Sequence, residues 1–115
     1  MQHRDWKLRI QDILESIEGI QNYVSGMSLD DFLRDQRTID AVVRRFTIIG
    51  EAASHVPDVI CKKSPEVPWI DMRAMRNFVV HEYFGVSDII VWNTVQDDLP
   101  SVVEPLERLF SSEGD

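Results

Sequence analysis

The sequence predicts one all-α domain, an antiparallel bundle of four or five helices. Its 115 residues are the usual length of a single domain. Apolar residues recur every three or four positions along almost the whole chain, as on the buried face of a helix. No segment alternates apolar and polar residues as a strand does, and no repeat is visible. We therefore expect a single helical domain over residues 1–115, with frayed ends at 1–4 and 111–115.

The first two helices are predicted from residues 5–33. A long amphipathic helix begins near Asp5, a candidate N-cap, and reaches Ser25, where Gly26 ends it. Its apolar stripe consists of Ile10, Ile13, Leu14, Ile17 and Val24. Ser28 then resembles an N-cap followed by acids in the first turn, which predicts a short helix through Leu33.

The second long helix and the loop after it are predicted from residues 39–68. The apolar stripe of this helix consists of Ile39, Val42, Val43, Phe46, Ile49 and Ala53. It ends near Val56, because Pro57 disfavours a helical conformation in the residue before it. Residues 57–68 contain three prolines and two lysines, and we expect them to form the one substantial loop.

Three further helix boundaries are predicted in the C-terminal half. Pro68 suits the start of a third helix over residues 69–84, which Gly85 stops. Ser87 or Asp88 can cap a fourth helix that runs through residue 99. Pro100 then kinks or restarts the helix, which continues toward residue 110.

The charge of the chain is unevenly distributed. The net charge of −8 argues against a general nucleic-acid or membrane-surface binder, because polyanions attract basic faces. Residues 34–76 nevertheless carry a net charge of +2, whereas residues 77–115 carry −7. Either the exposed faces simply differ in charge, or an anionic ligand meets the middle of the chain.

Several classes of protein and site are disfavoured by what the sequence lacks. Cys61 is the one cysteine, so neither an internal disulfide nor a thiolate metal site is expected. No apolar run approaches the length of a membrane span, and no signal peptide follows Met1. His3 lies near the N-terminus, and His55 follows Glu51 by four residues on one helix face without a metal-binding motif around it. We expect a cytoplasmic protein without metal, cofactor or membrane contact.

The strongest candidate for chemistry is the polar group that interrupts the apolar third helix. Arg76, Asn77, His81 and Tyr83 would be costly to bury without partners. Arg76 and His81 point about 140° apart on an ideal helix. They converge if the arginine wraps around the helix, if the helix distorts near His81, or if two copies face each other across a dimer axis. A purely structural network of buried polar groups remains an alternative.

This combination of side chains fits RNA cleavage by attack of the 2′-hydroxyl. Histidine exchanges protons near neutral pH and can act as a general base or acid. Arginine offers a planar fork of donors for phosphate oxygens and can stabilise charge on the phosphorane-like transition state. Asparagine can orient either group, and no step needs a metal.

The segment Arg76-Asn77-x-x-x-His81-x-Tyr83 resembles the Arg-x4-His-x-Tyr signature of HEPN-domain proteins, specifically the HepT-like (DUF86) family. The likeness extends from about residue 8 to residue 109. Further segments that resemble the family are residues 40–45, residues 49–53, Pro68-Trp69, residues 83–86, Val91-Trp92 and Asp98-Leu99-Pro100.

The resemblance implies a homodimeric, metal-independent ribonuclease that acts as the toxin of a toxin–antitoxin pair. Arg76 and His81 match the catalytic pair, which both subunits bring to a cleft at the dimer interface, and Asn77 matches the polar residue that supports them. The implied antitoxin is a small nucleotidyltransferase (MntA-like) that transfers AMP to Tyr83 and thereby silences the nuclease.

Two other functions stay open at this stage. The chain could be a non-catalytic HEPN module that binds a nucleotide or serves as the docking subunit of a nucleotidyltransferase, or it could be a purely structural helical protein. Further RNA or phosphate contacts are expected from bases in the middle of the chain, although solvation alone also explains them. These candidates are Arg44, Arg45, Lys62, Lys63 and Arg73.

Overall fold

The computed structural model describes residues 3–77 and 87–112, and helices account for most of them. No strand occurs within these two ranges, so the predicted all-α class is confirmed. The elements are α1 (His3–Tyr23), α2 (Leu29–Leu33), α3 (Gln36–Ser54), α4 (Asp58–Cys61), α5 (Trp69–Ala74), the 3₁₀ turn η1 (Met75–Asn77), α7 (Asp88–Asn93), the π-helical turn η2 (Thr94–Asp98) and α8 (Pro100–Ser111).

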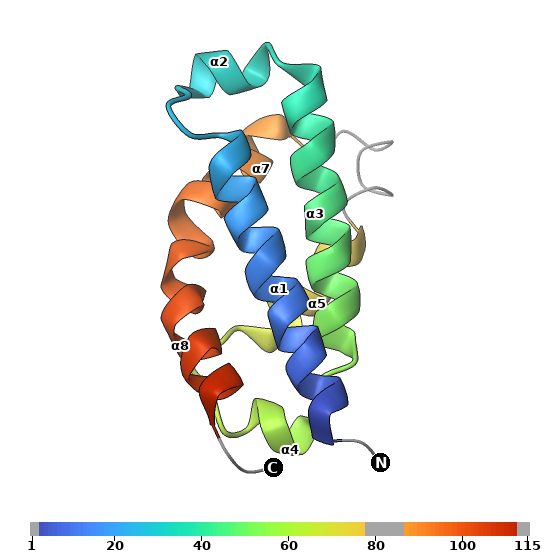
Figure 1. The fold of residues 1–115 in the computed structure, drawn as a ribbon. Helices are drawn as coiled ribbons and strands as arrows, with labels where there is room; N and C mark the ends of the chain where they lie inside the picture. Colours follow the sequence, from blue (N-terminus) through green and yellow to red (C-terminus); the bar gives the residue numbers. More distant parts are fainter. Residues whose placement is uncertain (1–2, 78–86, 113–115) are drawn as a thin grey trace.

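The long helices α1 and α3 lie side by side and run in opposite directions (Figure 1). Helix α8 packs on α1, while α5 and η1 pack on α3. The apolar stripes predicted from the sequence meet between these helices and form one core. Its fully buried side chains include Ile10, Ile13, Ile17, Ile20, Ile39, Phe46, Ile49, Met72, Leu99 and Leu106.

The connection between α1 and α2 follows the sequence prediction closely. Gly26 has a φ of 79°, a left-handed conformation that glycine adopts without steric cost. The Ser28 hydroxyl accepts a hydrogen bond from the backbone N–H of Asp31 at 3.1 Å, and the Asp31 carboxylate accepts one from the N–H of Ser28 at 3.1 Å. This reciprocal pair fixes the start of α2 and turns the chain toward α3.

The loop predicted over residues 57–68 is partly wrong, because it contains the short helix α4. The carbonyl of Pro57 accepts hydrogen bonds from the N–H groups of Ile60 at 2.9 Å and Cys61 at 3.0 Å. Proline suits this place, since the first turn of a helix leaves its N–H groups without partners. The turn buries Ile60 and Cys61 in the core, and this burial stabilises a segment whose prolines favour a loop.

Two helices depart from regular α geometry where the sequence predicted continuous α-helix. The third helix tightens into η1 at Met75, and residues 78–86 lie outside the described residues. The fourth widens into η2, where the N–H of Leu99 donates to the carbonyl of Thr94, five residues back, at 3.1 Å. Pro100 accounts for the widening, because it has no N–H to donate and its ring crowds the carbonyl four residues earlier.

None of the helices in the described part of the chain is both long enough and apolar enough to cross a membrane.

The junction of α2 and α7 allows a direct test of this packing. Phe32 is fully buried, and its ring centroid lies 5.2 Å from that of Trp92. We expect Phe32→Ala to lower the free energy of unfolding by about 3–5 kcal/mol, because it leaves a cavity in the core. Leu8→Ala is the control, since Leu8 is 55% exposed. Equal losses for the two variants in denaturant unfolding would contradict this packing.

Candidate active site

The structure places the described half of the predicted motif at the end of α5. Arg76 and Asn77 lie on the turn η1, and both are exposed. His81 and Tyr83 lie outside the described residues. The helix tightens into a 3₁₀ turn at Arg76, whereas the distortion considered near His81 concerns residues outside the described ranges.

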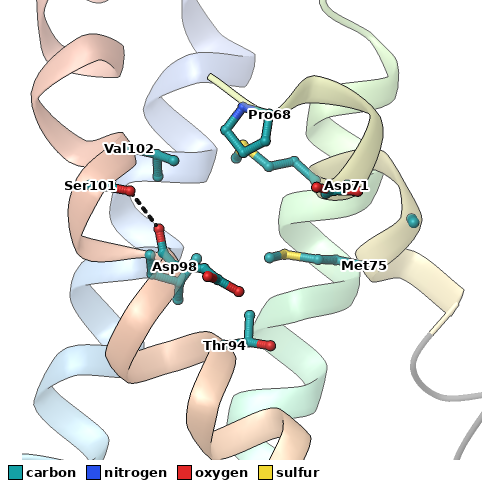
Figure 2. A pocket seen from close by; sticks show the side chains of 10 residues that line it. Pro68, Asp71, Met75, Thr94, Asp98, Ser101 and Val102 are labelled. Atoms are coloured by element: carbon teal, nitrogen blue, oxygen red, sulfur yellow. Dashed lines mark hydrogen bonds between the residues drawn. The ribbon is translucent and has the colours of Figure 1, made fainter. Parts of the chain in front are cut away.

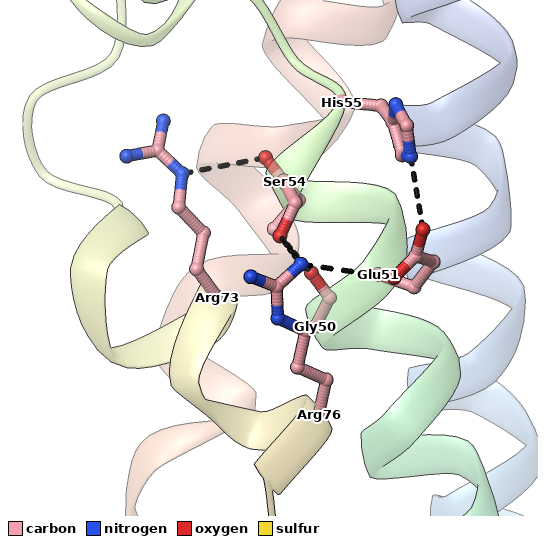
Figure 3. Close-up of polar contacts among 7 residues, drawn as sticks. Gly50, Glu51, Ser54, His55, Arg73 and Arg76 are labelled. Atoms are coloured by element: carbon pink, nitrogen blue, oxygen red, sulfur yellow. Dashed lines mark hydrogen bonds and ion pairs between the residues drawn. The ribbon is translucent and has the colours of Figure 1, made fainter.

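The Arg76 guanidinium is directed onto one face of α3 (Figure 3). Its Nη1 donates a hydrogen bond to the Ser54 hydroxyl at 2.9 Å and lies 3.7 Å from Oε1 of Glu51. Among the described residues, no group bonds the Nε and Nη2 donors of Arg76. The guanidinium is therefore held at one nitrogen by α3, and no other described residue occupies the donors with which it could bind an anion.

Glu51 links Arg76 to the end of α3. Its Oε2 lies 2.9 Å from Nε2 of His55, the residue that caps the C-terminus of this helix. The hydrogen bond with His55, together with the electrostatic effects of His55, Arg76 and Arg9, holds the pKa of the Glu51 carboxyl below its ordinary value. The prediction that Glu51 and His55 share one face is confirmed, and Glu51 stays ionised among basic groups.

A close backbone contact brings η1 onto α3. A Cβ atom at Gly50 would overlap the amide nitrogen of Arg76, and it would lie 2.9 Å from the Arg76 Cβ and 3.0 Å from the Arg73 carbonyl oxygen. Two of these three atoms belong to the backbone, so they cannot rotate away as a flexible side chain would. Glycine at this position therefore permits the approach that places the Arg76 side chain beside Ser54 and Glu51.

Two of the other predicted RNA contacts are engaged elsewhere in the structure. Arg73 donates to the Ala53 carbonyl at 3.5 Å and to Sγ of Cys61 at 3.2 Å, and it lies 3.7 Å from the Asp58 carboxylate. Burial raises the pKa of the Cys61 thiol, which opposes ionisation in spite of this arginine. Arg45 stacks on the Tyr23 ring and donates to its hydroxyl at 3.1 Å and 3.2 Å.

The remaining predicted contacts, Arg44, Lys62 and Lys63, are exposed. Their side chains make no hydrogen bond or ion pair with other described residues. The candidate bases thus fall into two classes. Arg45 and Arg73 are held in contacts within the protein, whereas Arg44, Lys62 and Lys63 are exposed and have no described partner. The structure does not bring Arg44, Lys62 or Lys63 into the contacts around Arg76.

A cavity of about 440 Å³ lies between α5 and the η2–α8 segment (Figure 2). Met72, Met75, Leu99 and Val102 line its apolar part, and Asp71 and Asp98 supply its charged groups. No basic side chain lines it within the described ranges. Carboxylates repel phosphate, so this cavity does not suit RNA, and the Arg76 face of η1 is the better candidate site.

The described residues contain no candidate metal-binding site. No group of three or more histidine, cysteine, aspartate or glutamate side chains gathers there in an arrangement that could hold a metal ion.

Comparison with known proteins identifies the family. A sequence profile described as "Ribonuclease HepT-like" matches residues 13–109, which include α3, η1 and the whole Arg76–Tyr83 motif. The chain belongs to the HepT-like family. The resemblance seen in the sequence is thereby confirmed, and the HepT-like motif begins at the turn that Gly50 brings onto α3.

Several relatives match the chain over nearly their full length. A protein of Thermococcus cleftensis named "Probable ribonuclease HepT" is 39% identical over 93% of this chain and 94% of its own. A "Putative RNase" of Methanocaldococcus jannaschii is 34% identical over 96% of this chain and 91% of its own. Another "Putative RNase", from Caldanaerobacter subterraneus, is 34% identical over 90% of this chain and 93% of its own. No solved structure matches the chain significantly.

Reasoning from the sequence missed the contacts that Gly50, Glu51 and Ser54 make with Arg76. These residues lie more than twenty positions before the arginine, and the period of a single helix does not show which helices meet. The available signal was Gly50 itself. A glycine inside a strongly apolar helix costs about 1 kcal/mol relative to alanine and often marks a close backbone approach.

The close contact at Gly50 can be tested by substituting this glycine. We expect Gly50→Ala to lower the free energy of unfolding by about 1–3 kcal/mol, because overpacking exceeds the gain of ~1 kcal/mol in helix propensity. It should also displace Arg76 and reduce any activity that depends on this arginine by at least about tenfold, which is ~1.4 kcal/mol of transition-state stabilisation.

Gly19→Ala is the matched control for this prediction. A Cβ atom at Gly19 would meet only the far end of the Arg45 side chain, at 3.2 Å. We therefore expect no loss of stability or activity from Gly19→Ala in urea unfolding and activity assays. Equal behaviour of the two variants would contradict the contact between Gly50 and η1.

Proposed function

We propose that this chain is a metal-independent ribonuclease in which Arg76 and His81 form the catalytic pair. Membership of the HepT-like family supports this proposal. The observation that carries it is the state of Arg76, whose half-exposed side chain is held at Nη1 by α3 and has no other bonded partner among the described residues. A guanidinium that is positioned at one end and free at the other suits transient binding of a phosphate.

In the proposed reaction, a 2′-hydroxyl of RNA attacks the adjacent phosphorus. His81 accepts the hydroxyl proton, a P–O bond forms, and the bond to the 5′-oxygen breaks. The leaving oxygen takes a proton from an imidazolium, so a cyclic phosphate and a free 5′-hydroxyl result. Arg76 donates hydrogen bonds to the phosphorane-like transition state, on which negative charge accumulates.

The proposal includes a homodimer, with Arg76 and His81 of both subunits in one cleft. Exposed apolar side chains on α4 and α5 support it. Ile70 on α5 is 79% exposed, and Val59 on α4 is 63% exposed. Contact with a second copy would remove such surface from water.

We further propose that the chain is the toxin of a toxin–antitoxin pair and acts in the cytoplasm. A small nucleotidyltransferase of the MntA type would transfer AMP to Tyr83, which lies seven residues after Arg76. The added phosphate would place a negative charge beside the arginine that RNA needs, so the modified protein would be inactive.

The nuclease proposal is tested by cleavage of RNA in excess EDTA. We expect the purified protein to cleave, and we expect His81→Ala to lower the rate by about 10²–10⁴-fold, the usual contribution of a general acid–base. Arg76→Ala should cost about 10²–10³-fold, as the loss of a donor to a charged transition state does. Arg108→Ala is the control, because Arg108 pairs with Glu66 and Glu104 at a distance from the site.

Two results would contradict the nuclease proposal. One is full activity in His81→Ala, and the other is dependence on a divalent metal. Absence of cleavage together with calorimetric binding of ATP or AMP would instead support a non-catalytic nucleotide-binding or docking subunit.

The modification is tested by intact mass after co-expression with a nucleotidyltransferase encoded by the neighbouring gene. We expect a gain in whole units of AMP, because the transferase adds complete adenylate groups. Tyr83→Phe should abolish the gain. Tyr23→Phe should leave it unchanged, because the Tyr23 hydroxyl is engaged by Arg45. A gain that persists in Tyr83→Phe would assign the modification to another residue.

A further inference from the structure

Basic groups from three elements surround the Glu51 carboxylate. Arg76 approaches it from η1 at 3.7 Å, and His55 approaches from the end of α3 at 2.9 Å (Figure 3). Arg9 comes from α1, close enough for its charge to act on this carboxylate. The Arg9 side chain makes no hydrogen bond or ion pair with another described residue. One carboxylate thus lies beside two basic groups, and a third base acts on it through its charge.

The contact between Arg76 and Glu51 is weak enough to be replaced. The two side chains are 49% and 56% exposed, and exposed ion pairs of this kind contribute little to stability. At 3.7 Å, this pair lacks the short hydrogen bonds of a good arginine–carboxylate fork. A phosphate can accept two parallel hydrogen bonds from a guanidinium, so it competes favourably for the free donors of Arg76.

We propose that Arg76, His55 and Arg9 form a binding site for a backbone phosphate of RNA, and that Glu51 occupies this site until RNA displaces it. The inference rests on the proposed ribonuclease function and extends it to α1 and α3. The bound group is the RNA phosphate next to the one that is cleaved, and the guanidinium of Arg76 would bridge the two phosphates, with His55 and Arg9 on the neighbouring one. Glu51 thus acts as an internal competitor that lowers affinity for RNA.

The distribution of charge favours a phosphate at this place. On the other side of α5, the cavity is lined by Asp71 and Asp98, and it repels anions. The face formed by α1, α3 and η1 instead combines three basic groups with one displaceable carboxylate. A protein with a net charge of −8 needs such a local site to hold a polyanion.

The direct test measures binding of a short 2′-O-methyl RNA, which the 2′-hydroxyl mechanism cannot cleave. Glu51→Gln should tighten binding about fivefold, because one negative charge near the phosphate is removed. Glu104→Gln is the matched control. It changes the net charge by the same amount and removes the partner of Arg108 in an i,i+4 ion pair on α8, so this variant should bind RNA like the wild type. Glu51→Asp keeps the charge and should stay within about twofold of the wild type.

The basic side of the site has its own test. Arg9→Gln and His55→Gln should weaken binding, and Arg9→Gln should reduce the slope of log affinity against log salt by about 0.7, the value for one lost contact to single-stranded nucleic acid. Arg108→Gln is the matched control, since it removes a charge that is paired with Glu66 at 2.7 Å.

The proposal is overturned if Glu51→Gln binds no more tightly than Glu104→Gln, or if Arg9→Gln behaves like Arg108→Gln. Thermal unfolding of each variant accompanies the binding measurement, and these substitutions outside the buried core should leave the melting temperature unchanged. Cleavage in EDTA tests the ribonuclease function separately. Cleavage without these binding differences therefore rejects the phosphate site alone, whereas absence of cleavage rejects the ribonuclease proposal.

Discussion

The close contact between Gly50 of α3 and the backbone of η1 is the constraint on which the candidate site depends. A side chain at this position would overlap the Arg76 amide, so the two segments could not pack as they do. Met72 and Met75 of the same segment are buried, and their burial anchors the segment in the core. The Arg76 guanidinium consequently lies within reach of the Ser54 hydroxyl, and its orientation follows from packing and not from one surface ion pair.

Charge is divided within this small protein by the α5–η1 segment. One side of the segment borders a cavity that carries Asp71 and Asp98, whereas the other carries Arg76 beside α3. The net charge of −8 is thus an average over faces of opposite character. An acidic protein of this kind can bind RNA at a small site while the rest of its surface discourages non-specific binding.

Local signals in the sequence predicted the helices and most of their ends. Gly26, the Ser28–Asp31 capping pair, Pro68 and Ser87 each act through their own backbone chemistry, so their effects could be predicted without a partner. Three other features could not be predicted from local signals. They are the α4 turn, the 3₁₀ turn at Arg76, and the pairing of Arg76 with Glu51 and Ser54. Each depends on contacts between segments that are distant along the chain, and helical periodicity does not specify these contacts.

The central claim is that Gly50 contributes to RNA cleavage by placing Arg76. A double-mutant cycle tests it most directly, with cleavage rates measured for Gly50→Ala, Arg76→Ala and the combined variant. The claim predicts that Gly50→Ala costs at least about tenfold in the wild-type background and almost nothing once Arg76 is alanine. Equal losses in both backgrounds would contradict it, because Gly50 would then act on the protein independently of Arg76.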